Sequence, residues 1–290
     1  MSRPANVSTA SSFALLAPAV LMFAAFVIYP LAGNVWVSLH AWDGAGPMTW
    51  VGLDNYRELW ADPAFAVSVR NNARWLLLYL LAPALGLALA VFLNQSIAGM
   101  RLARSLFFMP FVVSQVVVGL VFAWFFHTRF GLFNQILESL GLPPVALLDS
   151  EDTAIYTLIL AGLWPQVAYC MILYLTGLAT VRPELTEAAR LDGANGWRLL
   201  WHVVLPQLRP VHFIVVMVCV VSALRSFDYV MIMTFGGPHG STSVLAFYMY
   251  EQTFVSSRYG YGAAIATVLL LMMSGIIGVL LWRLLRKERA

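Results

Sequence analysis

The chain has 290 residues, of which 61% are hydrophobic and 11% charged, and its formal net charge is +3. A soluble domain is normally roughly 45–50% apolar and about 25% charged. A soluble chain of this length has too little interior to bury so much apolar surface. Composition therefore excludes an ordinary soluble domain and predicts an integral membrane protein, with lipid as the solvent for much of its surface.

The apolar runs, taken in chain order, predict an all-α membrane protein with six transmembrane helices. Five uncharged runs exceed the roughly 20 residues that a helix needs to cross the hydrocarbon core. A sixth is apolar apart from His212, Arg225 and Asp228. The first run is too long for the h-region of a signal peptide, so we expect it to be an uncleaved span. The expected spans are about 13–39, 75–98, 105–127, 154–180, 211–235 and 260–282, in a transmembrane domain of residues 13–284 between cytoplasmic ends at 1–12 and 285–290.

Basic residues predict the orientation. With the N-terminus inside, segments 1–12, 101–104, 182–210 and 283–290 hold eleven basic and four acidic residues, against five basic and nine acidic on the other side. Basic residues favour the cytoplasmic side. We therefore expect a multi-pass cell-membrane protein with both termini in the cytoplasm. The positive charge is a topology signal, so membrane lipid is an expected partner and nucleic acid is not.

Two cysteines, Cys170 and Cys219, fall inside predicted spans. Free cysteine behaves as a small apolar residue and is often buried. We expect two buried small residues rather than a disulfide or a metal-binding pair.

A charged passage at 182–210 interrupts the apolar runs. Pro183 suits the first turn of a helix, and Asp192-Gly193 predicts a sharp turn that ends it. A second short helix is expected at 197–204, after which Pro206 and Pro210 prevent clean continuation into the next span. These residues predict a helix–turn–helix elbow, which is either a docking element or an ordinary amphipathic interfacial loop.

The residues of this elbow resemble the EAA loop of binding-protein-dependent ABC importer permeases. That pattern has EAA, three residues, GA, a later LP and a final P; Trp201 stands where it usually has phenylalanine. The matching positions are Glu187, Ala188, Ala189, Asp192, Gly193, Ala194, Leu205, Pro206 and Pro210.

A second stretch is similar to the carbohydrate-uptake group of these permeases, specifically its MalF-like or UgpA-like half. It comprises Phe227-Asp228, Thr234, Gly236-Gly237-Pro238, Thr242 and Tyr259-Gly260-Tyr261-Gly262. The resemblance implies a type I ABC importer permease fold, with 183–204 as the cytoplasmic coupling helix and the nine EAA-loop positions as its ATPase-coupling residues. It also implies import of a sugar, an oligosaccharide or a related glycerol-phosphate or amino-sugar solute. The implied partners are a second, MalG-like permease, two ABC ATPase subunits or a homodimer, and an extracytoplasmic solute-binding protein.

The sequence supports an ATPase on another chain. A P-loop needs GxxxxGK[ST], whose lysine reaches the phosphates, and the single lysine here is Lys287 in the C-terminal tail. We therefore expect a transport subunit with no catalytic residues, no metal ligands and no bound cofactor, with ATP and Mg²⁺ on the partner ATPase.

Polar groups inside spans are costly and mark candidate solute contacts. A sugar site needs aromatic faces together with amide or hydroxyl groups. The candidates are Trp164, Gln166, Tyr169, Ser222, Arg225, Ser226 and Tyr229. Two alternatives stay open: the small residues at 219–226 favour close helix packing equally well, and Arg225 either pairs with Asp228 or faces an anionic solute.

An ion-coupled secondary transporter is the rival function. It would need intramembrane carboxylates for proton or sodium coupling. Asp228 is the one acidic residue inside a predicted span, and it lies near the outer end. The sequence therefore favours the importer permease.

Overall fold

The structure is a computed structural model that describes residues 9–95 and 97–288. Its described residues are mostly helical, and they form two compact units. The first unit comprises the described residues up to Ala61 together with Met249–Val268. The second comprises Asp62–Tyr248 and the described residues from Leu269 on.

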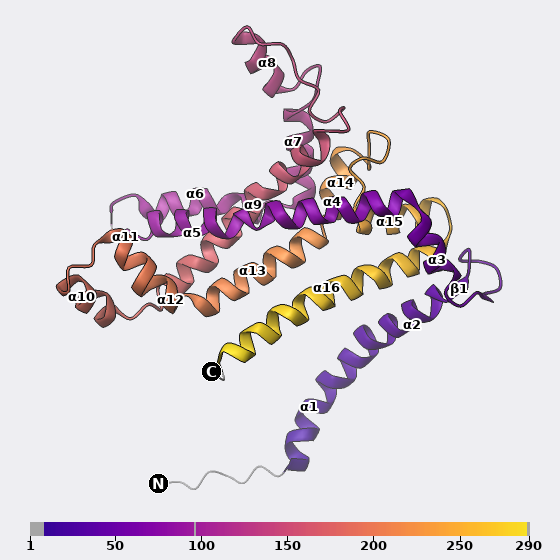
Figure 1. Cartoon of the computed structure of the whole chain (residues 1–290), viewed down its shortest axis with the longest axis horizontal. Helices are drawn as coiled ribbons and strands as arrows, with labels where there is room; N and C mark the ends of the chain where they lie inside the picture. Colours follow the sequence, from indigo (N-terminus) through magenta and orange to yellow (C-terminus); the bar gives the residue numbers. More distant parts are fainter. Residues whose placement is uncertain (1–8, 96, 289–290) are drawn as a thin grey trace. The chain divides into compact units, whose positions relative to one another are not determined.

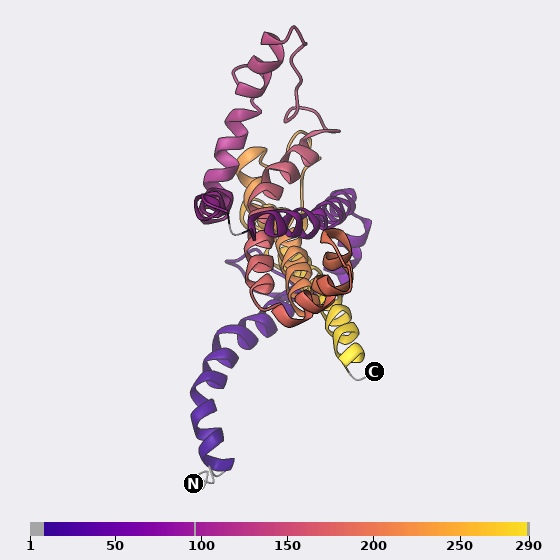
Figure 2. The same ribbon diagram turned by 90° about the vertical axis from the view of Figure 1, so that its left-hand side faces the viewer.

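The first unit begins with one long helical run. Helix α1 (Thr9–Phe23), the π-helical turn η1 (Ala24–Ile28) and α2 (Tyr29–Ser38) follow one another without a break and form a gentle curve (Figure 2). The most apolar part of the stretch Leu15–Ser38 contains no buried residue. Such a helix must be covered by lipid or by another chain.

A short polar structure follows this run. Strands β1 (His40–Ala41) and β2 (Thr49–Trp50) pair in antiparallel register, with His40 opposite Trp50. Helix α3 (Asp54–Ala61) comes next, and the side chain of Asn55 donates to the carbonyl oxygens of Ser38 and His40, both at 2.9 Å. In the hairpin turn, the backbone N–H groups of Gly46 and Ala45 lower the pKa of Asp43.

The second unit is organised around α9 (Ala154–Leu178). This helix contacts α4 (Pro63–Tyr79), α5 (Leu81–Leu93), α6 (Met100–Val112), α7 (Gln115–Phe125), α13 (Arg209–Leu224) and α14 (Phe227–Met233) (Figure 1). The close approach of α5 depends on Gly86, where an added Cβ would lie 2.5 Å from Cys170 Cβ and 2.8 Å from the Met171 nitrogen. The helices within residues 183–207 are described below. The others are α8 (Leu132–Ser139) in the second unit, η3 (Glu251–Val255) in the first, and α15 (Leu245–Tyr250) and α16 (Tyr259–Glu288), whose residues are divided between the two.

The apolar helices can be compared with the expected spans. Among the described residues, four helical stretches are long and apolar enough to cross a membrane: Leu15–Ser38, Pro63–Leu93, Ala154–Leu178 and Tyr259–Arg283. Two bent pairs raise the number to six if each is one span: α6 with α7, bent by 93°, and Gly196–Gln207 with α13, bent by 77°. The six-span count lies within this range, and its exact boundaries stay a prediction.

Some helices begin earlier than the charge pattern indicates. Helix α4 starts at Pro63, twelve residues before the expected span, and α6 starts at Met100, so Arg101 and Arg104 lie in a helix rather than a loop. The cause in α6 is local, because Arg104 Nε donates to the carbonyl oxygen of Leu93 at 2.9 Å. Charge marks where a span meets water, and a helix continues past that point when its polar side chains find partners.

Candidate functional site

The elbow has the predicted helix–turn–helix form. Helix α10 (Pro183–Leu191) ends at a turn in which Gly193 has a φ of +85°. The Gly193 N–H donates to the Arg190 carbonyl and the Ala194 N–H to the Ala189 carbonyl, at 3.0 and 2.9 Å. This is a glycine helix cap that satisfies the last carbonyls of α10. Open space surrounds the Gly193 Cα, so the backbone angle is what calls for glycine here.

The second half of the elbow joins it to the core. Helix α11 (Gly196–Leu199), the π turn η2 (Leu200–Val204) and α12 (Leu205–Gln207) precede a bend at Leu208. Pro206 and Pro210 fall in the first turns of α12 and α13, where a missing N–H is tolerated. Leu208 is buried in the α5–α9–α13 core, so the elbow is anchored to these three helices.

The elbow leaves apolar side chains uncovered. Leu191 is 90% exposed and Trp197 70% exposed, although both lie in a passage rich in charge. The ring of Trp197 packs edge-on against that of Trp201, with 5.6 Å between the ring centroids. Glu187 and Ala188 are exposed beside them and Ala189 is half-buried. Exposed large apolar groups clustered with charge are typical of a surface that another protein covers.

Six of the seven predicted solute contacts line one cavity of about 260 Å³ in the second unit. We call it the pathway cavity; it lies between α9, α13 and α14. Gln166 and Tyr169 come from α9, and Tyr169 stacks on Phe111 with 4.4 Å between ring centroids. The others are Ser222, Arg225, Ser226 and Tyr229. The structure thus brings together amide, hydroxyl, guanidinium and aromatic groups.

Trp164 does not line this cavity. It lies in an apolar groove with Leu106, Phe107 and Pro110, and its ring packs against Phe122 at 5.7 Å. A helix turns by about 100° per residue, so Trp164 points about 140–160° away from the direction shared by Gln166 and Tyr169. The structure thus separates Trp164 from the other six candidates, and its contact with solute stays a prediction.

The small residues of α13 serve two purposes. Cys219 and Ala223 are fully buried, whereas Ser222 and Ser226 line the pathway cavity. The Sγ atoms of Cys219 and Cys170 lie 3.5 Å apart as free thiols, and Gln166 Nε2 approaches Cys219 Sγ at 3.3 Å. Close packing therefore accounts for Cys219 and Ala223, whereas the contact of Ser222 and Ser226 with solute stays a prediction.

Arg225 and Asp228 line the pathway cavity together without pairing. Among the described residues no ion pair within 4.0 Å joins them. Arg225 lies at the break between α13 and α14, where its backbone leaves the helical conformation. The guanidinium is therefore available to a solute.

Several lining residues were not predicted. Tyr79 comes from α4, Phe111 and Val113 from the end of α6, and Gln115 from the first turn of α7. Phe111, Val113 and Gln115 flank the 93° bend between α6 and α7, and Tyr79 comes from α4, which contacts α9. Pro110 inside α6 and Ser114, the N-cap residue of α7, are the sequence signals near this bend.

Comparisons with known proteins show the family. The model of the family described as "Binding-protein-dependent transport system inner membrane component" matches residues 82–289. The chain therefore belongs to this family of permease subunits of ABC importers and is a multi-pass inner-membrane protein.

Individual relatives match nearly the whole chain. The probable ABC transporter permease protein PH1215 of Pyrococcus horikoshii is 35% identical, over 94% of this chain and 96% of its own. The sulfoquinovosyl glycerol permease SmoG of Agrobacterium fabrum is 31% identical, over 94% of this chain and 90% of its own. The trehalose/maltose permease MalF of Thermococcus litoralis is 31% identical, over 88% of this chain and 86% of its own.

A solved structure confirms the fold class. A chain of a bacterial ABC transporter that imports the acidic polysaccharide alginate superposes with a TM-score of 0.81. The match covers 96% of this chain and 95% of the other at 21% identity. The type I ABC importer permease fold expected from the sequence is thus confirmed.

Proposed function

We propose that this chain is a transmembrane permease subunit of an ATP-driven importer for a carbohydrate or a related solute. We assign the solute class because the solutes for which the chain's relatives are named agree with the chemical groups that line its pathway cavity. Permeases named for trehalose/maltose and sulfoquinovosyl glycerol are related along most of their length, and the pathway cavity offers an aromatic face beside amide and hydroxyl groups. Those are the groups that hold polyhydroxylated solutes.

The pathway cavity is the proposed solute site of this half of the importer. Gln166, Ser222 and Ser226 would hydrogen-bond solute hydroxyls, and Tyr169, backed by Phe111, would stack on a sugar face. The Tyr229 hydroxyl is buried without a hydrogen-bond partner in the described part of the chain. An unsatisfied buried donor is costly, and a solute hydroxyl would satisfy it.

The elbow is the proposed coupling element. Its exposed Leu191 and Trp197 and the glycine cap at Gly193 fit a surface that docks into another protein. That protein would be an ABC ATPase subunit carrying ATP and Mg²⁺, present as two subunits or a homodimer. Elbow and termini would be cytoplasmic, and the nine EAA-loop positions would be the coupling residues.

The remaining partners complete the proposed assembly. A MalG-like permease would form the other half of the pathway, and the long run of α1 and α2, whose most apolar part is unburied, is available to it or to lipid. The family is defined by dependence on a binding protein, which would deliver the solute to the opposite side from the elbow. ATP binding would close the ATPases, move the elbow and open the cavity outward.

Uptake measurements test this function. A strain lacking the chain should lose accumulation of at least one labelled sugar from a panel of mono-, di- and oligosaccharides, and the intact gene should restore it. Depletion of ATP should abolish that uptake, while a proton or sodium ionophore that spares ATP should leave it. Uptake that fails with the ionophore alone would support an ion-coupled secondary transporter instead.

A further inference from the structure

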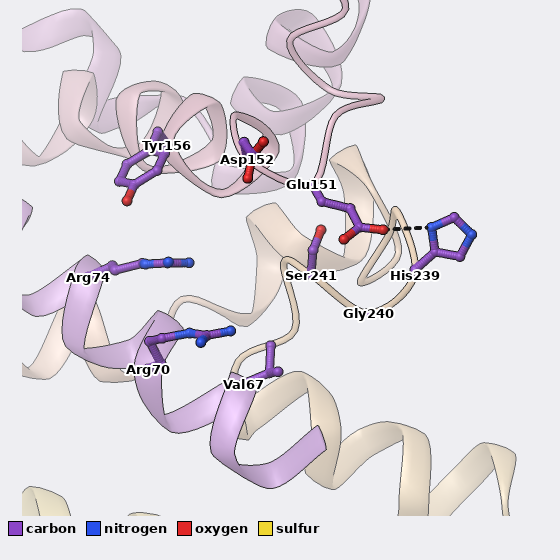
Figure 3. A pocket seen from close by; sticks show the side chains of 9 residues that line it. All are labelled: Val67, Arg70, Arg74, Glu151, Asp152, Tyr156, His239, Gly240 and Ser241. Atoms are coloured by element: carbon purple, nitrogen blue, oxygen red, sulfur yellow. Dashed lines mark hydrogen bonds and ion pairs between the residues drawn. The ribbon is translucent and has the colours of Figure 1, made fainter. Parts of the chain in front are cut away.

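The second unit contains another polar cavity, of about 410 Å³, which we call the arginine cavity (Figure 3). Arg70 and Arg74 of α4 form one wall, and they face Glu151 and Asp152, which precede α9, and Tyr156 in its first turn. Because α9 runs from this end to the elbow, the cavity lies on the opposite side of the second unit from the elbow. It shares no lining residue with the pathway cavity.

The two arginines act together. They lie one turn apart on α4, and both side chains extend toward the loops that carry Glu151 and Ser241 (Figure 3). Arg74 is held in place, because its Nη1 donates to Asn71 Oδ1 at 3.0 Å and its guanidinium lies 5.5 Å from the Tyr156 ring centroid. The wall is therefore partly ordered before any ligand arrives.

The two arginines of this cavity form no direct ion pair with its carboxylates: in residues 9–95 and 97–288, no ion pair within 4.0 Å joins Arg70 or Arg74 to a carboxylate. Glu151 is engaged by His239, whose Nδ1 lies 3.0 Å from its Oε1. The lining thus holds two guanidinium groups and two carboxylates, Glu151 and Asp152, and in the described residues neither guanidinium lies within ion-pair distance of a carboxylate.

A further donor points to a ligand. The Ser241 hydroxyl is buried and has no hydrogen-bond partner among the described residues, although Ser241 lines the cavity. A buried hydroxyl left unpaired costs free energy. The cavity therefore combines two guanidinium groups with a hydroxyl donor that has no partner among the described residues.

We propose that the arginine cavity is a binding site for an oxyanion, namely a carboxylate, sulfonate or phosphate group. The planar guanidinium forms paired hydrogen bonds to such groups, and two of them one helical turn apart grip one group from the same side. Ser241 donates a further hydrogen bond. Glu151 and Asp152 oppose a free anion, but their oxygens can accept hydrogen bonds from hydroxyls beside the acidic group.

The position of the arginine cavity suits a binding step that precedes entry of the solute into the pathway cavity. Arg74 and Tyr79 are five residues apart on α4, about 7.5 Å, and Tyr156 and Gln166 are ten apart on α9, about 15 Å. The oxyanion belongs either to an acidic solute or to an acidic side chain of the binding protein. If it belongs to the solute, the inference rests on the proposed function and narrows the solute to an acidic carbohydrate.

Direct binding tests the site without transport. The complete importer in nanodiscs should bind inorganic phosphate and acetate at low ionic strength, measured by calorimetry. The double variant Arg70→Gln/Arg74→Gln should bind at least tenfold more weakly. Arg57→Gln/Arg129→Gln removes two charges elsewhere and should bind as the wild type does. No binding by the wild type, or equal binding by all three proteins, overturns the proposal.

A second double variant separates the charge of arginine from its planar geometry, and it serves as the test if the glutamine variant does not fold. Arg70→Lys/Arg74→Lys keeps both positive charges but lacks the planar guanidinium groups. Its affinity for phosphate and acetate should therefore fall between those of the wild type and the glutamine variant. If the glutamine variant does not fold, the lysine variant decides: wild-type affinity in it contradicts recognition by paired hydrogen bonds.

Two further measurements identify the source of the oxyanion. If it is part of the solute, Arg70→Gln/Arg74→Gln raises the KM for uptake while docking of the binding protein is unchanged. If it is a protein side chain, docking weakens and becomes less sensitive to salt. If neither changes, the site has no part in import and the inference fails, while the proposed function, tested by the uptake panel, stands.

Discussion

The side-chain nitrogen of Asn71 lies 2.7 Å from the carbonyl oxygen of Ser241 and donates a hydrogen bond to it. The same nitrogen donates to the carbonyl oxygen of Ser243 at 2.8 Å, and the Asn71 side chain is fully buried. One amide thus joins α4 to the loop after α14 and also orients Arg74. Binding-site geometry and local stability depend on the same residue here.

Replacing this amide should destabilise the protein. Asn71→Ala leaves the carbonyl oxygens of Ser241 and Ser243 without this donor, and we expect a loss of about 1–3 kcal/mol in the free energy of unfolding. Thermal unfolding of the purified importer measures this. Asn94→Ala, at an exposed position, is the control. Equal unfolding midpoints for the two variants would show that the hydrogen bonds of Asn71 contribute nothing.

Gly86 should tolerate no larger side chain. Its Cα lies so close to α9 that any Cβ would press on Cys170 and the Met171 backbone, so Gly86→Leu must push α5 away from α9. Overpacking of this kind costs about 1–3 kcal/mol. Gly278→Leu, where open space surrounds the Cα, is the matched control. A stability of the Gly86 variant at or above that of the control contradicts the close packing.

Tyr169 and Trp164 should differ in their effect on transport. Tyr169 lines the pathway cavity and Trp164 lies on another face of α9. Tyr169→Ala should raise the KM for uptake of the identified sugar at least tenfold, equivalent to about 1.4 kcal/mol. Trp164→Ala should change KM less than twofold when uptake is scaled to the amount of importer. The opposite order would support the sequence-based assignment of Trp164.

The elbow shows what local chemistry can predict. Pro183 opens α10, Gly193 provides the left-handed turn, and Pro206 and Pro210 accompany the 77° bend. Each of these effects arises within a few residues of the side chain that causes it. The sequence was sufficient for this element because its shape depends little on distant contacts.

The pathway cavity shows where sequence reasoning stops. The residues on α9 and α13–α14 could be selected by polarity, but Tyr79 and Gln115 join them only through packing against α9 and the bend between α6 and α7. Likewise, whether Arg225 pairs with Asp228 depends on side-chain positions at the α13–α14 break. Three-residue spacing alone could not decide it.

Co-purification with a Gly193→Arg variant tests the central claim most directly. The tagged chain, solubilised gently from native membranes, should bring down an ATPase with a P-loop and a second permease. Gly193→Arg strains the left-handed turn and adds a bulky charge to an open surface. It should lose the ATPase while keeping the permease partner. Recovery of the wild type alone in several mild detergents, or an ATPase that stays bound to the variant, would contradict the account of the elbow as the coupling element of an importer.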